Sequence, residues 1–487
     1  MDLTQATMIE LRDAVAAKDV SAAELTRGYL DRIESNNEAL GAFLEVHGER
    51  ALARAADVDA GRITGELAGV PVAVKDLFCT SYGKTTASSR MLEHYRSPFT
   101  ATAVRRLEDA GAIVLGKTSM DEFAMGSSCE NCAFGGAKNP WDLTRVPGGS
   151  SGGSAVAVAA DLCAASLGSD TGGSIRQPAA FCGVVGLKPT YGRISRSGMV
   201  AFASSLDQCG PFTRTVADAA LLTKVMAGVD PLDGTTAPID VEPGFDDVDR
   251  AVPDLRIGVA KQYVLEGANE PAVQRATDDA IAFYRDAGAE IVEVDLPHTK
   301  YGIPVYYVVA TAECSSNLAR YDGVHFGHRT SEPVADIVEL FSRSRAEGFG
   351  DEVKRRVMLG TYALSSGYHD QYYNRALAVR RLIKRDFDHA FAKCDAILCP
   401  TTTGPAFKLG DKADDPLAMY LNDVYTVNAN LAGIAGVSLP AGTCDVDGQR
   451  LPVGVQLLGD AFAEAKLLRV ARMYEGAHEF AAMRPTI

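Results

Sequence analysis

A run of small side chains, SAVAVAADLCAAS at residues 154–166, lies between two segments rich in glycine and serine. Small side chains let a helix approach its neighbours closely, so we expect a tightly packed, buried helix here. Glycine- and serine-rich segments often form flexible linkers. Because apolar stretches flank these two, we expect them to be loops packed against the core of the protein.

Strand and helix patterns alternate along the rest of the chain, which favours an α/β protein. Residues 1 to about 60 are expected to be helical, with Ser21 and Glu24 at the spacing of a capping box. Residues 229–252 are acidic, rich in proline and expected to form a surface loop. We expect a large mixed, mostly parallel central sheet covered by helices on both faces. The apolar runs expected to be strands are LAGVPVAVKDLF, GAIVLGKT, LRIGVAKQYV, EIVEVDLP, DAILCPTT, GVSLPAG and LPVGVQLLG.

The composition excludes some classes of function. The net charge of −15 gives no basic surface for a nucleic acid. No segment reaches the roughly 18 consecutive apolar residues of a membrane span. The N-terminal MDLTQATMIELRDAV lacks the basic and apolar regions of a signal peptide. We therefore expect a cytoplasmic protein that does not span a membrane and does not itself bind RNA.

Three short motifs match common patterns but lack the necessary context. GAIVLGKT at 111–118 fits a P-loop, yet its middle residues predict a strand, which cannot wrap a phosphate. GGSSG at 148–152 fits a nucleophile elbow, but the preceding NPWDLTRVPGG has two prolines and predicts a loop. A triad with a downstream histidine stays open on these residues alone. Cys129 and Cys132 have no second pair nearby, so no zinc site is expected.

The stretch from Gly148 to Ala179, GGSSGGSAVAVAADLCAASLGSDTGGSIRQPA, resembles the amidase-signature family over its whole length. GVPVAVKD at 69–76 is similar to the segment that presents the catalytic lysine in that family. The resemblance implies the amidase-signature fold as a single domain over residues 1–487, with its core at about 65–215. It also implies a triad of Lys75, Ser150 and Ser174, with Ser150 at a cis Gly–Ser peptide.

The chemistry of these residue types agrees with that triad. A serine hydroxyl is a weak nucleophile unless a neighbour takes its proton. Burial disfavours the ammonium form of a lysine, so Lys75 at the end of an apolar strand can accept a proton. By resemblance, the proton passes from Ser174 through Ser150 to Lys75 and later to the leaving nitrogen. The backbone amides of Thr171, Gly172, Gly173 and Ser174 are expected to form the oxyanion hole.

Segments outside the signature resemble one branch of the family, the A subunits of bacterial tRNA-dependent amidotransferases. These segments are 312–327, 352–376, 414–442 and LPVGVQLLG. The resemblance implies a glutaminase, with Arg356 for the α-carboxylate, Asp423 for the α-ammonium and Tyr307 nearby. Neighbouring Arg355 and Tyr306 leave a one-residue shift open. It also implies a heterotrimer whose kinase-like B subunit holds the tRNA, ATP and Mg²⁺, with a small C subunit. No cofactor or metal is expected in this chain.

Two other functions stay open at this point. A stand-alone amidase acting on a small acylamide would need neither partner subunits nor the pair Arg356 and Asp423. A scaffold subunit without catalytic activity would not need Lys75, Ser150 and Ser174, and their presence argues against it.

Overall fold

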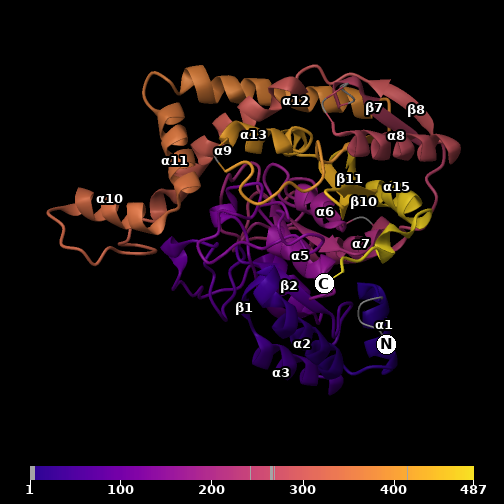
Figure 1. The fold of residues 1–487 in the computed structure, drawn as a ribbon, viewed down its shortest axis with the longest axis horizontal. Coiled ribbons are helices and arrows are strands. Elements are labelled where there is room, and N and C mark those ends of the chain that lie inside the picture. The colour runs from indigo at the N-terminus through magenta and orange to yellow at the C-terminus, as the bar shows by residue number, and fades with distance from the viewer. Residues whose placement is uncertain (1–5, 242, 264–266, 268, 414, 487) are drawn as a thin grey trace.

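The computed structural model describes residues 6–241, 243–263, 267, 269–413 and 415–486. Residues 1–5 of the expected N-terminal helical segment, and 242 and 264 in the expected loop and strand, lie outside that description. The helices of the described part cover much of the surface (Figure 1). They are α1 Met8–Ala17, α2 Ala22–Leu40, α3 Gly48–Asp59, α4 Thr102–Asp109, α5 Gly152–Ala159, α6 Arg176–Cys182, α7 Val216–Met226, α8 Pro271–Asp286, α9 Gly302–Asn317, α10 Ile337–Gly348, α11 Asp351–Leu364, α12 Arg375–Phe391, α13 Pro416–Tyr420, α14 Val427–Ala432 and α15 Glu464–Gly476.

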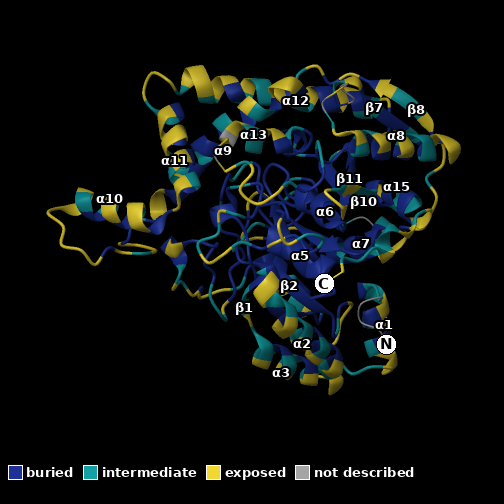
Figure 2. Ribbon diagram, in the orientation of Figure 1, coloured by how far each residue is buried: buried dark blue, intermediate teal, exposed yellow. Residues whose placement is uncertain are grey.

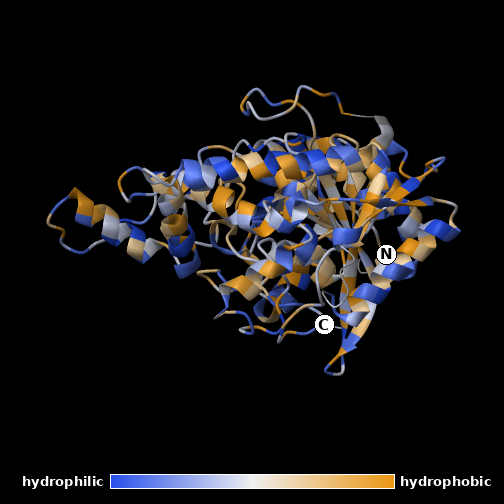
Figure 3. Cartoon of the chain, turned by 90° about the horizontal axis from the view of Figure 1, so that it is seen from above, coloured by the Kyte–Doolittle hydropathy of each residue, from blue (hydrophilic) through white to orange (hydrophobic). Residues whose placement is uncertain are grey.

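Within the described residues, eleven strands form one sheet in the order β1-β3-β2-β4-β6-β5-β10-β11-β9-β7-β8. Many residues of the strands are hydrophobic and are coloured orange in Figure 3. The strands are β1 Phe43–Val46, β2 Pro71–Lys75, β3 Ile113–Thr118, β4 Ala165–Asp170, β5 Val185–Lys188, β6 Gln208–Thr213, β7 Arg256–Ala260, β8 Glu290–Val294, β9 Ala396–Pro400, β10 Ala435–Val446 and β11 Gln449–Gly459.

The sheet is mixed, as expected, but the expectation that it is mostly parallel is wrong. Only β2 with β3 and β4, and β7 with β8 and β9, pair in parallel among the described strands. The six remaining pairings are antiparallel. One cause is the tight hairpin between β10 and β11, where Asp447 and Gly448 have φ of 55° and 78°. An Asp-Gly pair favours this turn, and a two-residue turn can join only antiparallel strands.

Apolar side chains pack against both faces of the sheet. In β9, Leu398 belongs to one apolar cluster, while its neighbours Ile397 and Cys399 belong to another. Successive side chains of a strand point to opposite faces, so the two clusters lie on opposite sides of the sheet. One cluster includes residues of α7, α8 and α15, and the other includes residues of α5, α9 and α12. The expected helical cover on both faces is confirmed.

The small-residue run forms a buried helix only in its first half, because α5 ends at Ala159 and Ala165 and Ser166 already belong to β4. Every residue of α5 is buried (Figure 2). The helix packs on β4 and β2. The N-terminal segment contains α1, α2 and α3 as expected, and Ser21 and Glu24 form the capping box of α2. The short strand β1 between α2 and α3 was not expected. GAIVLGKT is indeed largely a strand, β3. No helix among the described residues is long and apolar enough to cross a membrane.

Candidate active site

Lys75 is the last residue of β2 and is completely buried. Its Nζ atom lies 2.7 Å from Ser150 Oγ, 2.8 Å from Ser151 Oγ and 2.9 Å from Ser169 Oγ. Burial lowers the pKa of Lys75 to about 7, although the carboxylate of Asp121 opposes that shift. In a substantial fraction of the molecules near neutral pH, Lys75 is therefore a neutral amine with a lone pair that can accept a proton.

The hydrogen bonds around Lys75 favour one direction of proton transfer. The Ser151 hydroxyl donates to the backbone oxygen of Ser169 at 3.1 Å, so its own oxygen is left to accept from the lysine. A neutral Lys75 has two N–H bonds and one lone pair. When the N–H bonds point to Ser151 and Ser169, the lone pair faces Ser150 and can accept its hydroxyl proton. The peptide between Gly149 and Ser150 is cis, as the family resemblance implies.

Ser174 lies in the turn after β4, here called the oxyanion turn (residues 171–174). This turn packs against the loop that precedes α5, here called the serine loop (residues 148–151). The amide of Ser151 donates to the Ser174 backbone oxygen at 3.2 Å. The Ser174 side-chain hydroxyl and the amides of Thr171, Gly172, Gly173 and Ser174 make no hydrogen bond within the described residues. Free amides on successive residues of a buried turn can donate to an oxyanion. Gly173 has φ of 145°, a conformation that requires glycine.

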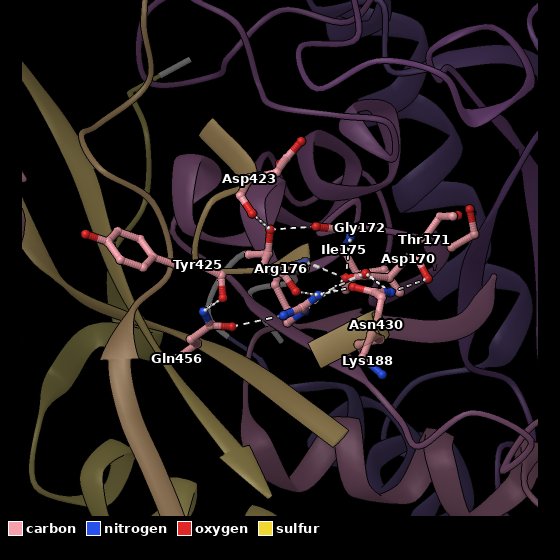
Figure 4. Close-up of polar contacts among 12 residues, drawn as sticks. Asp170, Thr171, Gly172, Ile175, Arg176, Lys188, Asp423, Tyr425, Asn430 and Gln456 are labelled. Carbon is pink, nitrogen blue, oxygen red and sulfur yellow. Dashed lines mark hydrogen bonds and ion pairs between the residues drawn. The ribbon is translucent and has the colours of Figure 1, made fainter. Parts of the chain in front are cut away.

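A buried polar network holds this turn from the other side (Figure 4). Asp170, at the end of β4, forms an ion pair with Arg176 at 3.1 Å, and both side chains are fully buried. Arg176 also donates to Asn430 Oδ1 at 2.7 Å and to Gln456 Oε1 at 3.1 Å. Burial opposes ionisation of Asp170, but Arg176 nevertheless holds its pKa below the usual value. The two ends of the turn are therefore fixed to each other through charge-assisted hydrogen bonds.

Asp423 lies beside the same turn, at the end of the short helix η8 (Leu421–Asp423). Its Oδ2 atom accepts a hydrogen bond from Ser127 Oγ at 2.5 Å, while the buried Oδ1 atom has no partner among the described residues. A Cβ atom placed on Gly173 would lie 3.2 Å from this Oδ1. Burial raises the pKa of Asp423 to about 7. A buried carboxylate oxygen without a partner is costly, so this geometry fits a cationic ligand group.

Arg356 enters the site from α11, and the structure distinguishes it from its neighbour. Arg356 is buried, whereas the side chain of Arg355 is 45% exposed. Arg356 Nε donates to Glu352 Oε1 at 2.7 Å, and its terminal nitrogens donate to no described residue. Its guanidinium lies 5.4 Å from the ring centre of Tyr307. This free end can bind a carboxylate with two parallel hydrogen bonds.

The two tyrosines of α9 have different neighbours. Tyr306 packs directly against the oxyanion turn, because a Cβ atom on Gly172 would lie 2.7 Å from its ring. Tyr307 contacts Tyr306 edge-to-face at 5.1 Å between ring centres and stacks on Tyr420 at 3.8 Å. Tyr307 thus lies near Arg356. Tyr306 contacts both Tyr307 and the turn.

Four residues of this site were not identified from the sequence. Ser151 and Ser169 contact Lys75, Ser127 binds Asp423, and Asp121 accepts hydrogen bonds from the amides of Cys129 and Asn131. Ser151 and Ser169 lie within the signature stretch, so their proximity to Ser150 and Ser174 was a usable signal. Ser127 and Asp121 are brought in by the long loop after β3, and no local pattern indicates their position.

The cysteine pair lies beside Ser119. Cys129 is buried against Gly152 at the start of α5, and both sulfurs lie within 4 Å of Ser119 Oγ. Among the residues that the structure describes, no group of three or more potential ligands could hold a metal ion. Burial raises the pKa of Cys129 to about 12, which keeps its thiol protonated.

This fold and the signature residues are those of a known family. The family model described as Amidase matches residues 24–468, and the chain belongs to that family. It is also 54% identical, over 491 residues and 100% of both chains, to the A subunit of glutamyl-tRNA(Gln) amidotransferase from Carboxydothermus hydrogenoformans. The crystal structure of the corresponding A subunit from Thermotoga maritima is similar at 39% identity and a TM-score of 0.81, covering 100% of this chain and 98% of that one.

Structural likeness alone does not separate this chain from other amidases. The native peptide amidase of Stenotrophomonas maltophilia has a TM-score of 0.82 at 32% identity, covering 99% of each chain. Its backbone therefore matches as well as that of the Thermotoga protein. Sequence identity distinguishes the two relatives, and it is higher for the amidotransferase component.

Proposed function

We propose that this chain is the glutaminase subunit of a tRNA-dependent amidotransferase, with Ser174 as nucleophile. The single observation that carries the choice of substrate is the unpartnered, buried Oδ1 of Asp423 beside the oxyanion turn. A simple acylamide offers no cation for this atom, whereas glutamine offers its α-ammonium group. The free end of Arg356 supplies a partner for the α-carboxylate.

In the proposed reaction, neutral Lys75 takes the proton of Ser150 as Ser150 takes that of Ser174. The Ser174 oxygen attacks the carboxamide carbon of glutamine, and the amides of the turn stabilise the oxyanion. Collapse of the tetrahedral intermediate breaks the C–N bond, and the amide nitrogen leaves as ammonia with the proton returned through Ser150. Water then releases glutamate from the glutamyl-Ser174 ester through the same proton path.

We further propose that the ammonia is used in a complex. The likeness to the A subunits of amidotransferases supports a heterotrimer with a small C subunit and a kinase-like B subunit. The B subunit would hold Glu-tRNA(Gln) or Asp-tRNA(Asn), ATP and Mg²⁺, because the net charge of −15 disfavours tRNA binding by this chain. Exposed Met358 and Leu359 on α11, and a cluster of Tyr362, Tyr368 and Tyr372 at its end and just after it, support association with another protein.

Three substrates test the proposed function. Glutamine, 4-carbamoylbutanoic acid, which lacks the ammonium, and 4-aminobutanamide, which lacks the carboxylate, are compared by ammonia release, with Ser174→Ala as the blank. We expect kcat/KM to be highest for glutamine by on the order of 100-fold, since each truncation leaves a buried charge unpaired. Equal rates with all three substrates would instead support a stand-alone amidase.

Co-purification of the tagged chain from its native cells tests the partners.

A further inference from the structure

A buried carboxylate outside the site described above connects two parts of that site. Glu122 follows Asp121 in the loop after β3, and its side chain is almost fully buried. Its Oε1 atom accepts a hydrogen bond from Ser89, and its Oε2 atom accepts one from the Gly350 amide at 2.9 Å. Gly350 is the N-cap of α11, the helix that carries Arg356. Glu122 therefore joins the loop after β3 to the start of this helix.

The two adjacent acids of this loop face different elements. The backbone amide of Asp121 donates to the Ser150 oxygen at 3.2 Å, on the side of the serine loop. The Glu122 side chain contacts α11 instead, and both it and Gly350 line a cavity of about 490 Å³. One short peptide segment thus contacts both the proposed proton relay and the helix that carries the proposed carboxylate-binding residue.

The contact between Glu122 and the N-terminus of α11 depends on both shape and charge. Gly350 has no side-chain cap of its own, so Glu122 supplies the acceptor at this helix end. Burial raises the pKa of Glu122 to about 7, so near neutral pH part of the population carries the negative charge that a helix N-terminus favours. A Cβ atom on Gly350 would overlap Glu122 Oε2, so a larger residue at this position would push the carboxylate away. The backbone of Gly350, with φ of −72°, is open to any residue. Glycine leaves room for the Glu122 carboxylate here because it has no side chain, and not because of its backbone conformation.

We propose that Glu122 is a positioning residue that fixes α11, and thereby Arg356, relative to the nucleophile Ser174. This inference rests on the proposed function, because it assigns Arg356 to the α-carboxylate of glutamine. Arg356 lies six residues after Gly350, or about 9 Å along a helix. A shift at the N-terminus of α11 therefore displaces the Arg356 guanidinium. The groups of the proton relay do not lie on α11 and keep their contacts.

The test compares Glu122→Ala with the conservative Glu122→Gln. Glutamine at this position keeps an oxygen for the Gly350 amide, and its NH₂ group can donate to Ser89, whose hydroxyl can turn to the Gly348 oxygen, now 3.2 Å away. We expect Glu122→Ala to raise KM for glutamine on the order of tenfold, with kcat changed less than about threefold. Glu122→Gln should stay near the wild-type values. With 4-aminobutanamide, which has no carboxylate, kcat/KM should be the same for all three proteins.

A second variant approaches the contact from the other side. Gly350→Ala should raise KM for glutamine in the same way, because its methyl group displaces the Glu122 side chain. The double variant Glu122→Ala/Gly350→Ala should be no worse than Glu122→Ala alone, since the space is then empty. Thermal unfolding of each variant checks that it is folded.

Equal losses with glutamine and 4-aminobutanamide, or a failure of Glu122→Gln to retain the low KM, would overturn the role of Glu122. Additive effects in the double variant would do the same. A wild-type protein that hydrolyses 4-aminobutanamide as well as glutamine would instead overturn the proposed function. The two failures are therefore distinguishable.

Discussion

The Nζ atom of Lys75 lies 2.7 Å from the Oγ atom of Ser150, although the two residues are 75 positions apart in the chain. The parallel pairing of β2 with β4 brings Lys75 to the same edge of the sheet as the turn after β4. The serine loop and α5 precede β4 in the chain, so the lysine, Ser150 and Ser174 all meet at that edge. Ligands of α/β sheets bind at the carboxyl ends of such strands.

This contact predicts the effect of removing the lysine. Lys75→Met should lower kcat for glutamine on the order of 10⁴-fold, because the proton relay then has no acceptor. Lys188→Met is a matched control: Lys188 is also buried, and burial also lowers its pKa to about 7, but its Nζ binds only the Pro189 oxygen among the described residues. The control should lose far less activity. Similar losses in both variants would argue that a buried lysine matters only for folding.

The pH dependence of the reaction should report Lys75 directly. Burial lowers its pKa to about 7, and only the neutral amine accepts a proton, so kcat/KM should fall as the pH drops below about 7. Burial raises the pKa of Asp423 to about 7 as well, and its carboxylate must be ionised to bind an ammonium. The fall should therefore be steeper for glutamine than for 4-carbamoylbutanoic acid, whose rate reports Lys75 without Asp423. Identical profiles would contradict the role of Asp423.

The lowered pKa of Lys75 also affects the stability of the folded protein. The pKa of Lys75 is lower in the folded protein than the 10.5 of an exposed lysine, so the unfolded chain binds more protons between about pH 7 and 10.5. Stability therefore rises with pH across that window. The slope of the unfolding free energy against pH should be smaller in Lys75→Met than in the wild type, as urea unfolding at several pH values would measure.

Adjacent arginines on α11 provide an internal control for substrate binding. Arg356→Lys should raise KM for glutamine by about 10- to 100-fold, since an ammonium cannot form the paired hydrogen bonds of a guanidinium. Arg355→Lys should leave KM unchanged, because the Arg355 side chain is 45% exposed and binds Glu352. Steady-state ammonia release measures both. A larger effect at Arg355 would mean that the assignment is shifted by one residue.

Part of this site follows from the sequence alone. The long stretch that contains Ser150 and Ser174 predicts both residues, and the apolar run before Lys75 predicts its burial. The sequence does not predict that β5 and β6 separate β4 from β10, because strand order depends on packing between distant segments. It does not predict Ser127 or Asp121 either, since the loop that carries them has no periodic pattern. The Asp447–Gly448 pair favours a two-residue turn between antiparallel strands, a signal that the expectation of a mostly parallel sheet overlooked.

The buried ion pair beneath the oxyanion turn gives a prediction for stability. Arg176→Met should lower the free energy of unfolding by about 3–5 kcal/mol, because it leaves the fully buried Asp170 without its counter-charge. The double variant Arg176→Met/Asp170→Asn should regain part of that loss, since no unpaired charge remains. Urea unfolding measures both. A double variant less stable than Arg176→Met would contradict this account of the network.

Covalent labelling of the nucleophile tests the central claim most directly. A glutamine analogue with a diazoketone in place of its amide alkylates the group that attacks the carboxamide carbon. The modified peptide, located by tandem mass spectrometry, should carry one adduct on Ser174, and glutamine should protect against labelling. Ser174→Ala should remain unlabelled. Reproducible, glutamine-protected labelling of another residue, such as Cys132 or Ser150, would contradict the assignment of Ser174 as the nucleophile.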